Sequence, residues 1–444
     1  MQSLRGFKTI LCIIPSFLSL FVPSGSDPVL LDLPFVTVWN APTRPCLERF
    51  GVEIDLDVFD IVMNQNHSFL GDQVVIFYSN QLGHYPHYDQ DTKPVNGGLP
   101  QNASLEEHLM KARQDLEATI SGKNFKGVAV VDWENWQPLW NRNWKQRMLY
   151  KLRSLELVHQ KHPELPFRKA VKKARMEFED ASQKFMKSTL ELAQRLNPNG
   201  LWGFYGFPNC FNYEYKDSSY NYTGMCPVSE KRRNDLLTWL WRASRALYPD
   251  IYLEKQLKKS KHVRCFVKHR VEEGFRVAKV APGVDLPVLP YARIVYTYSM
   301  DFLTQGDLIQ TLGQSAALGA AGIILWGNTD YSASKESCLA VKSYVHETLG
   351  KYVKNVTRAA ILCSQSRCAG HGRCVRKDPS SDAHLHLDPK IFTITNNPLK
   401  EGLIVDNATS NGNLSQTWTQ FQCRCYKAWR GTNCTEGANT TQHI

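Results

Sequence analysis

The segment GVAVVDWENW, residues 127–136, carries the clearest structural signal in the chain. An apolar run of small and β-branched residues leads into two carboxylates, Asp132 and Glu134, which stand among tryptophans. Such a run predicts a buried strand that ends in reactive side chains. Side chains two residues apart on a strand point to the same face, so both carboxylates are expected to project together.

Comparable runs recur along the chain and alternate with helical patterns. They are FVTVWN (35–40), VVIFY (74–78), LWGFYG (201–206), DIYL (250–253), LPVLPYARIVY (286–296) and AGIILWG (321–327). Strands that alternate with helices indicate a parallel sheet. A glycine-rich phosphate loop is lacking, and most runs end in aromatic, acidic or amide residues, such as Asn40, Tyr78, Tyr205 and Trp326. We therefore expect an α/β barrel with its site at the carboxyl ends of the strands.

Helical signals separate these runs. Ser104 followed by Glu107 predicts a capping box at a helix start. An apolar stripe should face the barrel from that helix, made of Leu105, Leu109, Ala112 and Leu116.

The amino-terminal residues 1–26 are predicted to be a signal peptide. Arg5 and Lys8 precede an apolar run from Ile10 to Val22, and small residues follow. The later sequence lacks an apolar run of about 18 residues, and its last residues lack the hydrophobic tail of a lipid-anchor signal. We expect a mature chain without a transmembrane segment or lipid anchor, secreted or lysosomal.

Sequons and charge support this interpretation. Eight N-x-[ST] sequons occur, at Asn66, Asn102, Asn221, Asn355, Asn407, Asn413, Asn433 and Asn439. The formal charge of +11 falls to +9 without the signal peptide, which favours a polyanionic partner. Basic clusters at 168–175 and 255–262 could guide such a polymer or could be solvated helix faces. A nucleic-acid partner is not expected.

The cysteines suggest a second module. Without Cys12 of the signal peptide eleven remain, so one thiol lacks an intramolecular partner. Six of them crowd into residues 363–434, which predicts a catalytic domain at 27–359, a disulfide-rich module at 360–436 and a flexible tail at 437–444. Fifteen pairings of six cysteines are possible. A metal site is disfavoured, because oxidised cysteines suit the extracellular setting better.

The two carboxylates suit glycoside hydrolysis, which needs an acid for the leaving oxygen and stabilisation of positive charge at the sugar carbon. Projecting from one strand, they do not flank the bond from opposite sides as an enzymatic nucleophile and acid would. A substrate nucleophile fits better. The N-acetyl oxygen would attack, Glu134 would act as acid and then base, and Asp132 would orient the acetamide. A salt-bridging role for the pair is the alternative.

Long segments resemble the vertebrate hyaluronidases, including somatic, sperm-surface and snake-venom members. They include PFVTVWNAPT, VVIFYSNQLGHYP, VVDWENWQPLWNRNW, LWGFYGFPNCFNY, TWLWRASRALYPDIY, LGAAGIILWG and CSQSRCAGHGRC. The resemblance covers essentially the whole mature chain. It implies a distorted barrel with about seven main strands and an EGF-like carboxyl-terminal module. It also implies endo-hydrolysis of β-1,4 bonds after N-acetylglucosamine in hyaluronan, with retention, no cofactor and no metal.

The resemblance also assigns roles to single residues. The acid falls on Glu134, its helper on Asp132 and the acetamide-positioning tyrosine on Tyr205. Substrate-binding positions fall on Tyr78, Asn209, Tyr252, Arg270, Tyr291 and Trp326. For Arg270 a structural ion pair is an equal alternative. The implied disulfides are Cys46–Cys338, Cys210–Cys226, Cys363–Cys374, Cys368–Cys423 and Cys425–Cys434, which leaves Cys265 unpaired in what is expected to be a monomer.

Some positions depart from the family pattern. Asn209 replaces an acid found in many members, Asp250 replaces a serine, and Thr297 replaces an acid of some relatives. These changes bear on the pH optimum and on the preference for hyaluronan or chondroitin. Two alternatives to a hyaluronan hydrolase therefore stay open: a chondroitin-preferring hydrolase, and a weakly active or inactive hyaluronan-binding or gamete-surface protein.

Overall fold

The computed structural model describes residues 26–120, 122, 124–217, 221–280, 286–388, 392–396, 403–407 and 418–437. The predicted signal peptide, apart from Ser26, and the predicted tail beyond Gly437 lie outside the described residues.

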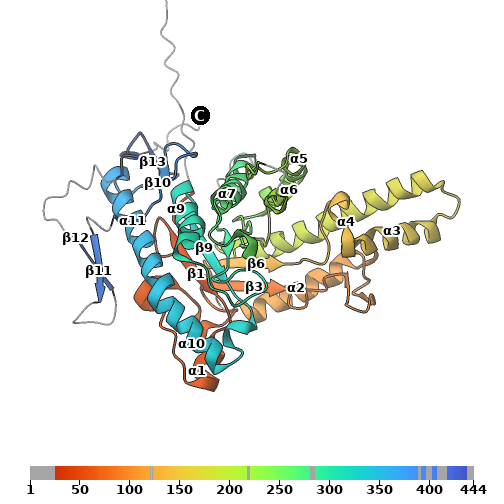
Figure 1. The fold of residues 1–444 in the computed structure, drawn as a ribbon. Coiled ribbons are helices and arrows are strands. Elements are labelled where there is room, and N and C mark those ends of the chain that lie inside the picture. Colours follow the sequence, from red (N-terminus) through yellow and green to blue (C-terminus); the bar gives the residue numbers. More distant parts are fainter. Residues whose placement is uncertain are drawn as a thin grey trace, which may run out of the picture.

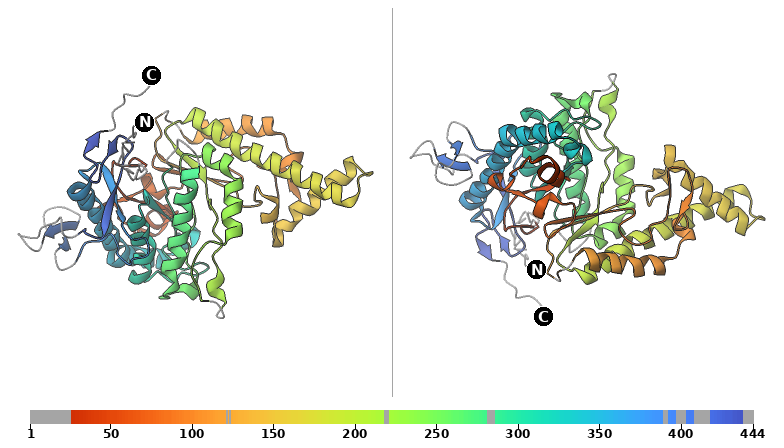
Figure 2. Two further views of the ribbon diagram at one scale, coloured as in Figure 1. Left: turned by 90° about the horizontal axis from the view of Figure 1, so that it is seen from above. Right: turned by 90° about the horizontal axis from the view of Figure 1, so that it is seen from below.

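A curled sheet of parallel strands forms the centre of the molecule (Figures 1 and 2). One ladder runs in the order β2 (Ile61–Val62), β1 (Val36–Asn40), β9 (Gly322–Trp326), β8 (Tyr291–Ala292), and another in the order β3 (Val74–Tyr78), β6 (Val128–Asp132), β7 (Leu201–Phe204). Single parallel bridges pair Tyr205 with Tyr248, Leu247 with Val288 and Asp250 with Tyr291, and thereby link β7 to β8. The predicted α/β barrel is confirmed, and it is distorted because part of its wall consists of single bridges.

Several strands are shorter than the sequence suggested. The predicted strand 286–296 contributes the two-residue β8 and single bridges at Val288 and Val295, and segment 250–253 contributes one bridge at Asp250. Proline offers no backbone N–H to a ladder, and Pro287 and Pro290 interrupt the first of these segments. Strand β6 ends at Asp132, so Glu134 stands just past it.

A side chain bridges the seam between β2 and β3. The buried Asn64 donates from Nδ2 to the carbonyl oxygen of Val74 at 2.7 Å, and its Oδ1 accepts from the N–H groups of Gln73 and Val74 at 3.0 Å each. These bonds imitate those of a neighbouring strand. A single amide thus connects the two ladders where backbone pairing stops.

Helices surround the barrel. They are α1 (Arg44–Phe50), α2 (Leu105–Thr119), α3 (Met148–Lys161), α4 (Phe167–Leu196), α5 (Val228–Leu236), α6 (Thr238–Ala243), α7 (His262–Val280), α8 (Gln305–Leu308), α9 (Gln314–Leu318), α10 (Lys335–Tyr344) and α11 (Gly350–Cys368). Helices α3 and α4 form a long hairpin that projects from the barrel, and α2 packs against α4 (Figure 1). The basic stretch 168–175 lies on this hairpin, where Lys173 and Arg175 pair with Glu177 and Glu179.

Helix α2 begins after Ser104 as predicted, but only the Ser104 half of the capping box forms, and the helix buries a different face. The Ser104 hydroxyl accepts the N–H of Glu107 at 3.2 Å. Ala112 and Leu116 are buried as expected, whereas Leu105 and Leu109 are only half-buried and His108 is buried instead. The His108 Nε2 lies 2.8 Å from the Thr189 hydroxyl of α4, so a polar contact occupies the helix interface.

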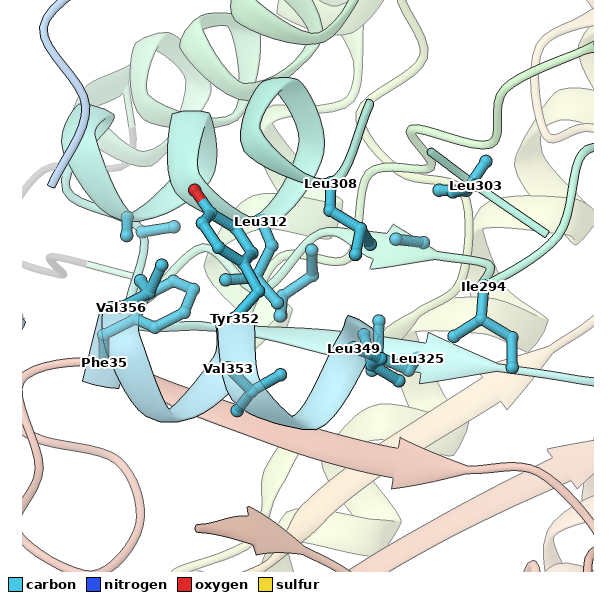
Figure 3. Packing of buried hydrophobic residues seen from close by; sticks show 14 of the residues in the cluster. Phe35, Ile294, Leu303, Leu308, Leu312, Leu325, Leu349, Tyr352, Val353 and Val356 are labelled. Atoms are coloured by element: carbon cyan, nitrogen blue, oxygen red, sulfur yellow. The ribbon is translucent and has the colours of Figure 1, made fainter. Parts of the chain in front are cut away.

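A large apolar cluster holds the carboxyl-terminal helices against the strands (Figure 3). Phe35 contributes from the position just before β1 and Leu325 from β9, and Leu308 and Leu312 from α8 and η8 (Ile309–Gly313). Tyr352, Val353 and Val356 cover them from α11 (Figure 3). Their burial supplies a large part of the free energy that fixes this side of the barrel.

Helix α11 continues through residue 360, where the second module was expected to begin. Beyond it, β10 (Gly372–Arg376) pairs antiparallel with β13 (Phe421–Cys425), and the pairs β11–β12 (Phe392–Asn396, Leu403–Asn407) and β14–β15 (Trp429–Arg430, Glu436–Gly437) are small hairpins. Trp418 and Phe421 belong to the same apolar cluster as the barrel. The division at 359/360 and the EGF-like character of this part stay predictions.

The two ends of the described chain lie against each other. From β10, the Arg373 side chain donates to the carbonyl oxygens of Pro34 and Asp27, at 2.7 and 2.8 Å, and also to that of Ser26. In addition, the Lys427 N–H donates to the Asp27 carboxylate at 3.1 Å. The segment that leads into β1 is therefore anchored by the last part of the chain. Across the described residues, every helix is too short or too polar to cross a bilayer.

Candidate active site

Asp132 and Glu134 lie together at the carboxyl end of β6. Between them Trp133 points the opposite way, into the core, where its ring stacks on Tyr85 with centroids 4.5 Å apart. Trp136 is buried beside it, and its indole N–H donates to the carbonyl oxygen of Pro86 at 2.8 Å. The alternation that the sequence predicted therefore holds through residue 134. Buried tryptophans fix the backbone that presents both acids.

Electrostatics favour protonation of this pair. Burial, reinforced by the charge of Glu134, raises the pKa of Asp132 to about 8. Glu134 reaches solvent at the mouth of the site, yet surrounding protein desolvates it and raises its pKa. The Arg147 guanidinium acts in the opposite direction, and Asp250 raises this pKa further. Two carboxyls that oppose each other's ionisation share protons as one unit.

One oxygen of Asp132 is left without a partner. Its Oδ1 is buried and accepts no hydrogen bond from the described residues. Buried polar atoms are nearly always bonded, so an exception requires an explanation, such as a catalytic role or a bound molecule that supplies the missing bond. Asp132 also pairs in register with Tyr78 on β3. The free oxygen is thus available to an N–H donor brought by a ligand.

Half-buried aromatic side chains surround the acids. The Trp326 indole N–H at the end of β9 donates to the Tyr78 hydroxyl at 3.0 Å. Tyr252 stacks on Trp326 with ring centroids 6.1 Å apart. The ring centroid of Tyr205 also lies 6.1 Å from that of Tyr252. We call Tyr78, Tyr205, Tyr252 and Trp326 the aromatic wall. Desolvation raises the pKa of Tyr205 and of Tyr252 well above the usual value, so both hydroxyls keep their protons.

Tyr291 is more deeply buried than the other aromatic residues predicted for the site. It is fully buried beneath the wall, 5.2 Å from the Tyr205 ring centroid, and its hydroxyl points to Asn40 Oδ1 at 3.5 Å. Asn40, the predicted polar end of β1, is buried too, and its Nδ2 has no partner among the described residues. Tyr291 therefore supports Tyr205 from below.

Arg270 is buried, and its guanidinium is bound by neighbouring groups of the chain. Its Nη1 donates to the Asp250 carboxylate at 2.7 Å and to the Asp250 carbonyl oxygen at 2.9 Å, while Nε donates to Asn212 at 2.8 Å. The guanidinium also lies over the Phe266 ring, 4.3 Å from its centroid. Arg270 therefore forms an ion pair with Asp250 in this structure, and its contact with substrate stays a prediction.

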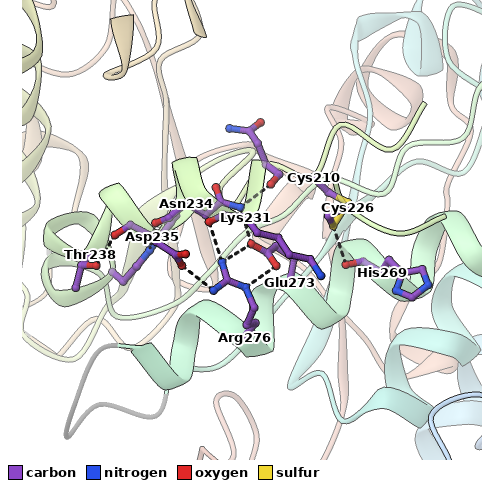
Figure 4. Close-up of polar contacts among 11 residues, drawn as sticks. Cys210, Cys226, Lys231, Asn234, Asp235, Thr238, His269, Glu273 and Arg276 are labelled. Atoms are coloured by element: carbon purple, nitrogen blue, oxygen red, sulfur yellow. Dashed lines mark hydrogen bonds and ion pairs between the residues drawn. A yellow bond between two sulfur atoms is a disulfide. The ribbon is translucent and has the colours of Figure 1, made fainter. Parts of the chain in front are cut away.

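Asn209 lies on the loop after β7 and contacts Gln137, with Nδ2 3.4 Å from Gln137 Oε1. Its carbonyl oxygen accepts a bond of 2.7 Å from Asn234 Nδ2. Asn234 in turn binds the buried Glu273, which pairs with Arg276 (Figure 4). This network, next to the Cys210–Cys226 disulfide, holds the loop from behind.

Sequence reasoning missed a cavity on the outer side of Glu134. It has a volume of about 1300 Å³, and Glu134, His87, Tyr88, Lys145, Arg147 and Tyr150 are among its lining residues. Arg147 donates from Nε and Nη2 to the Glu134 carbonyl oxygen, at 3.0 and 2.7 Å. Of the two acids, Glu134 alone lines this cavity. Its lining residues come from the short strand β4 (His87–Tyr88) and the turn after it, from the segment after β6 and from the start of α3, and periodicity does not reveal that these meet.

The described residues contain five disulfides, and they are the five pairs that the resemblance implies: Cys46–Cys338, Cys210–Cys226, Cys363–Cys374, Cys368–Cys423 and Cys425–Cys434. Cys265, half-buried on α7, forms no disulfide.

The sequons differ in accessibility. Asn66, Asn102, Asn221 and Asn433 are exposed. Asn355 is half-buried on α11, and its Oδ1 accepts the N–H of Leu387 at 2.7 Å. Asn413, Asn439 and the side chain of Asn407 lie outside the described residues.

The fold and the site together define a glycoside hydrolase: a barrel with paired carboxylates and an aromatic wall at the carboxyl ends of its strands. The family model for hyaluronidase matches residues 24–438, and the chain belongs to the hyaluronidase family. It is 47% identical to hyaluronidase-1 of Sus scrofa, covering 96% of this chain and 98% of the relative. It is also 47% identical to hyaluronidase-1 of Homo sapiens, covering 92% and 93%.

Solved structures agree with this membership. The crystal structure of bee venom hyaluronidase in complex with a hyaluronic acid tetramer is 32% identical in sequence, with a TM-score of 0.66, and the match covers 71% of this chain and 98% of the bee chain.

Proposed function

We propose that this chain is a secreted endo-β-N-acetylhexosaminidase that hydrolyses the β-1,4 bonds of hyaluronan with retention of configuration. The observation that supports this most directly is the unpartnered, buried Oδ1 of Asp132 beside the exposed Glu134, under an aromatic wall. An acetamide offers the N–H that this oxygen lacks. Its methyl group and the sugar ring offer apolar faces to the aromatic wall.

In the first step the acetamide carbonyl oxygen attacks the anomeric carbon, and Glu134 gives its proton to the departing glycosidic oxygen. The carbon–oxygen bond to the leaving sugar breaks, and a cyclic oxazoline-type intermediate forms on the substrate. Asp132 accepts the acetamide N–H and balances the positive charge that develops there. Tyr205, whose hydroxyl stays protonated, positions the acetamide.

In the second step the Glu134 carboxylate removes a proton from water, and that water attacks the same anomeric carbon. The acetamide ring opens, the product keeps the β configuration, and Glu134 is again protonated. Because the protonation of Asp132 depends on that of Glu134, acetamide binding determines which of the two carries the proton. An acetamide N–H bonded to Asp132 favours its ionised form, which leaves the proton on Glu134, where the leaving oxygen needs it.

Hyaluronan is the proposed substrate, and chondroitin differs from it in the configuration of one hydroxyl on the acetamido sugar. Asp250 pairs with Arg270, and Asn209 contacts Gln137, so we propose that these residues affect substrate preference through the position of the loops that carry them. The secretory pathway is the proposed location, supported by five disulfides and exposed sequons. We propose a monomer, in which Asn355 stays unglycosylated because Leu387 occupies its amide.

The test is the pair of variants Glu134→Gln and Asp132→Asn, assayed on hyaluronan and on chondroitin by product size. We expect Glu134→Gln to lower kcat by about 10³-fold or more and Asp132→Asn to cost nearly as much. Glu106→Gln, an exposed position on α2, is the matched control and should retain full activity. Circular dichroism would establish that each variant is folded.

Proton NMR of the first-formed product should show the β anomer. Undiminished cleavage by Glu134→Gln, or a first-formed α anomer, would overturn the mechanism. A wild-type chain that binds hyaluronan without shortening it would support the binding-protein alternative.

A further inference from the structure

We propose that the cavity on the outer side of Glu134 binds the leaving-group portion of the polymer, and that Lys145 and Arg147 bind the carboxylate of its first uronic acid. This inference rests on the proposed function and extends it to a subsite. We call the space lined by His87, Tyr88, Glu134, Lys145, Arg147 and Tyr150 the outer cavity.

Glu134 lies between the aromatic wall and the outer cavity. Asp132 lies beside the aromatic wall, since it pairs in register with Tyr78, and its buried Oδ1 is the proposed contact for the acetamide. Glu134 lines the outer cavity, and Asp132 does not. An acid that protonates the glycosidic oxygen must stand between the sugar that keeps the anomeric carbon and the sugar that leaves. The leaving sugar therefore enters the outer cavity.

The charge in the outer cavity suits the sugar that leaves. A cut after N-acetylglucosamine releases a chain that begins with a uronic acid, whose carboxylate is negative at neutral pH. Lys145 and Arg147 line the cavity, and neither forms an ion pair with a carboxylate in the part of the chain that is described. Asp89 also lines the space, with Oδ1 accepting the Lys93 N–H at 2.8 Å.

The local backbone and side-chain contacts direct Lys145 and Arg147 to the outer cavity. Arg147 uses Nε and Nη2 on the Glu134 carbonyl oxygen, which leaves Nη1 for a ligand. The exposed Lys145 has a left-handed backbone with φ of 53°, a conformation that costs energy for a residue other than glycine and that concentrates at binding sites. Its ammonium lies 5.1 Å from the Trp144 ring centroid.

Size and surface also fit a carbohydrate. Pockets for small ligands have volumes of about 300–1,000 Å³, so the outer cavity has room for more than one sugar. Tyr88, half-buried and packed edge-on against Tyr150 with centroids 5.5 Å apart, offers an aromatic face against which a pyranose ring packs. The site therefore combines an apolar wall with cations at the point where the bond breaks.

The experiment compares two substrates that share the acetamido side and differ in the leaving group. One is a hyaluronan octasaccharide, and the other is a hyaluronan tetrasaccharide that ends in N-acetylglucosamine linked to an uncharged aryl alcohol. The variants are Lys145→Ala, Lys145→Arg and the control Lys169→Ala, an exposed lysine of α4 outside the cavity. Arg147 is avoided because it also holds the Glu134 backbone.

We expect Lys145→Ala to lower kcat/KM on the octasaccharide about three- to fivefold more than on the aryl glycoside, mainly through KM. Lys145→Arg should restore most of the loss, and added salt should shrink it. Equal effects on both substrates, or a loss matched by Lys169→Ala, would overturn the inference while the proposed function stands. A wild-type chain inactive on the octasaccharide would instead overturn the proposed function.

Discussion

Trp326 and Tyr78 join two strands that have no backbone pairing with each other. The indole N–H of Trp326, at the end of β9, donates to the hydroxyl of Tyr78, at the end of β3, at a distance of 3.0 Å. In the sheet, β1 and β2 lie between them on one side. This bond crosses the barrel seam at the height of the reactive carboxylates and holds two members of the aromatic wall in register.

Tyr78→Phe should therefore weaken both stability and catalysis. The Trp326 N–H loses its acceptor, which should cost about 1 kcal/mol of unfolding free energy because water reaches the half-buried ring. A double-mutant cycle with Trp326→Phe, followed by chemical denaturation, should give a coupling of about 1 kcal/mol. Additive effects of the two substitutions would show that the bond contributes no net stability.

Asn64→Ala should destabilise the barrel more than any exposed substitution nearby. The change removes partners from two backbone N–H groups and a carbonyl oxygen of residues 73–74, and we expect a loss of about 2–4 kcal/mol. Thermal unfolding would measure it, with Gln65→Ala, its exposed neighbour, as control. Equal melting temperatures for the two variants would contradict the role of Asn64 at the seam.

Asp132→Asn should stabilise the fold progressively as pH rises. Folding raises the Asp132 pKa to about 8, above its value of about 4 in the unfolded chain. A folded state that holds its proton more tightly loses stability between those two values as pH increases. The Asp132→Asn variant has a neutral amide at this position, so it does not lose stability over this pH range.

Denaturation at pH 4 and pH 8 would test this. We expect little difference from wild type at pH 4 and a gain of about 1 kcal/mol or more at pH 8. The same difference at both values would mean that the folded-state pKa of Asp132 is not raised.

Asp250→Asn should move the pH profile as well as stability. Asp250 raises the Glu134 pKa, so its neutralisation should lower that pKa. The acid must be protonated to act, and the alkaline limb of kcat/KM should consequently shift to lower pH. The buried Arg270 also loses its counter-charge, at a cost of about 3 kcal/mol.

Asp235→Asn is the control, since Asp235 forms an ion pair with Arg276 at the surface (Figure 4). Its alkaline limb should match that of wild type. An unshifted limb for a folded Asp250→Asn protein would contradict the electrostatic link to Glu134.

The apolar runs of the sequence locate the long strands well because β1, β3, β6 and β9 are buried on both faces. The region 246–292 was harder to predict. Its prolines and single bridges give the same apolar pattern as a strand without a full ladder. The buried His108 of α2 was missed for a similar reason, since a stripe of apolar residues says nothing about a histidine that finds a hydroxyl on another helix.

For the candidate site, spacing alone brought Asp132 and Glu134 together, and resemblance added the aromatic wall. Neither indicated that Asp250 pairs with Arg270 or that Arg147 holds the Glu134 backbone. Those contacts join residues 13 to 20 positions apart through turns, where side-chain direction depends on the folded backbone.

The hydrogen bonds from Arg373 to residues 26–34 have a consequence for biosynthesis. The segment that enters the first strand leaves the ribosome early, yet its hydrogen-bond partner is made some 340 residues later. During synthesis this leading segment has no Arg373 side chain to bind until β10 has been made. A chain truncated before Gly372 would lack this anchor and the Cys363–Cys374 and Cys368–Cys423 bonds at once, so the segment that leads into the first strand of the barrel would lose the contacts that hold it.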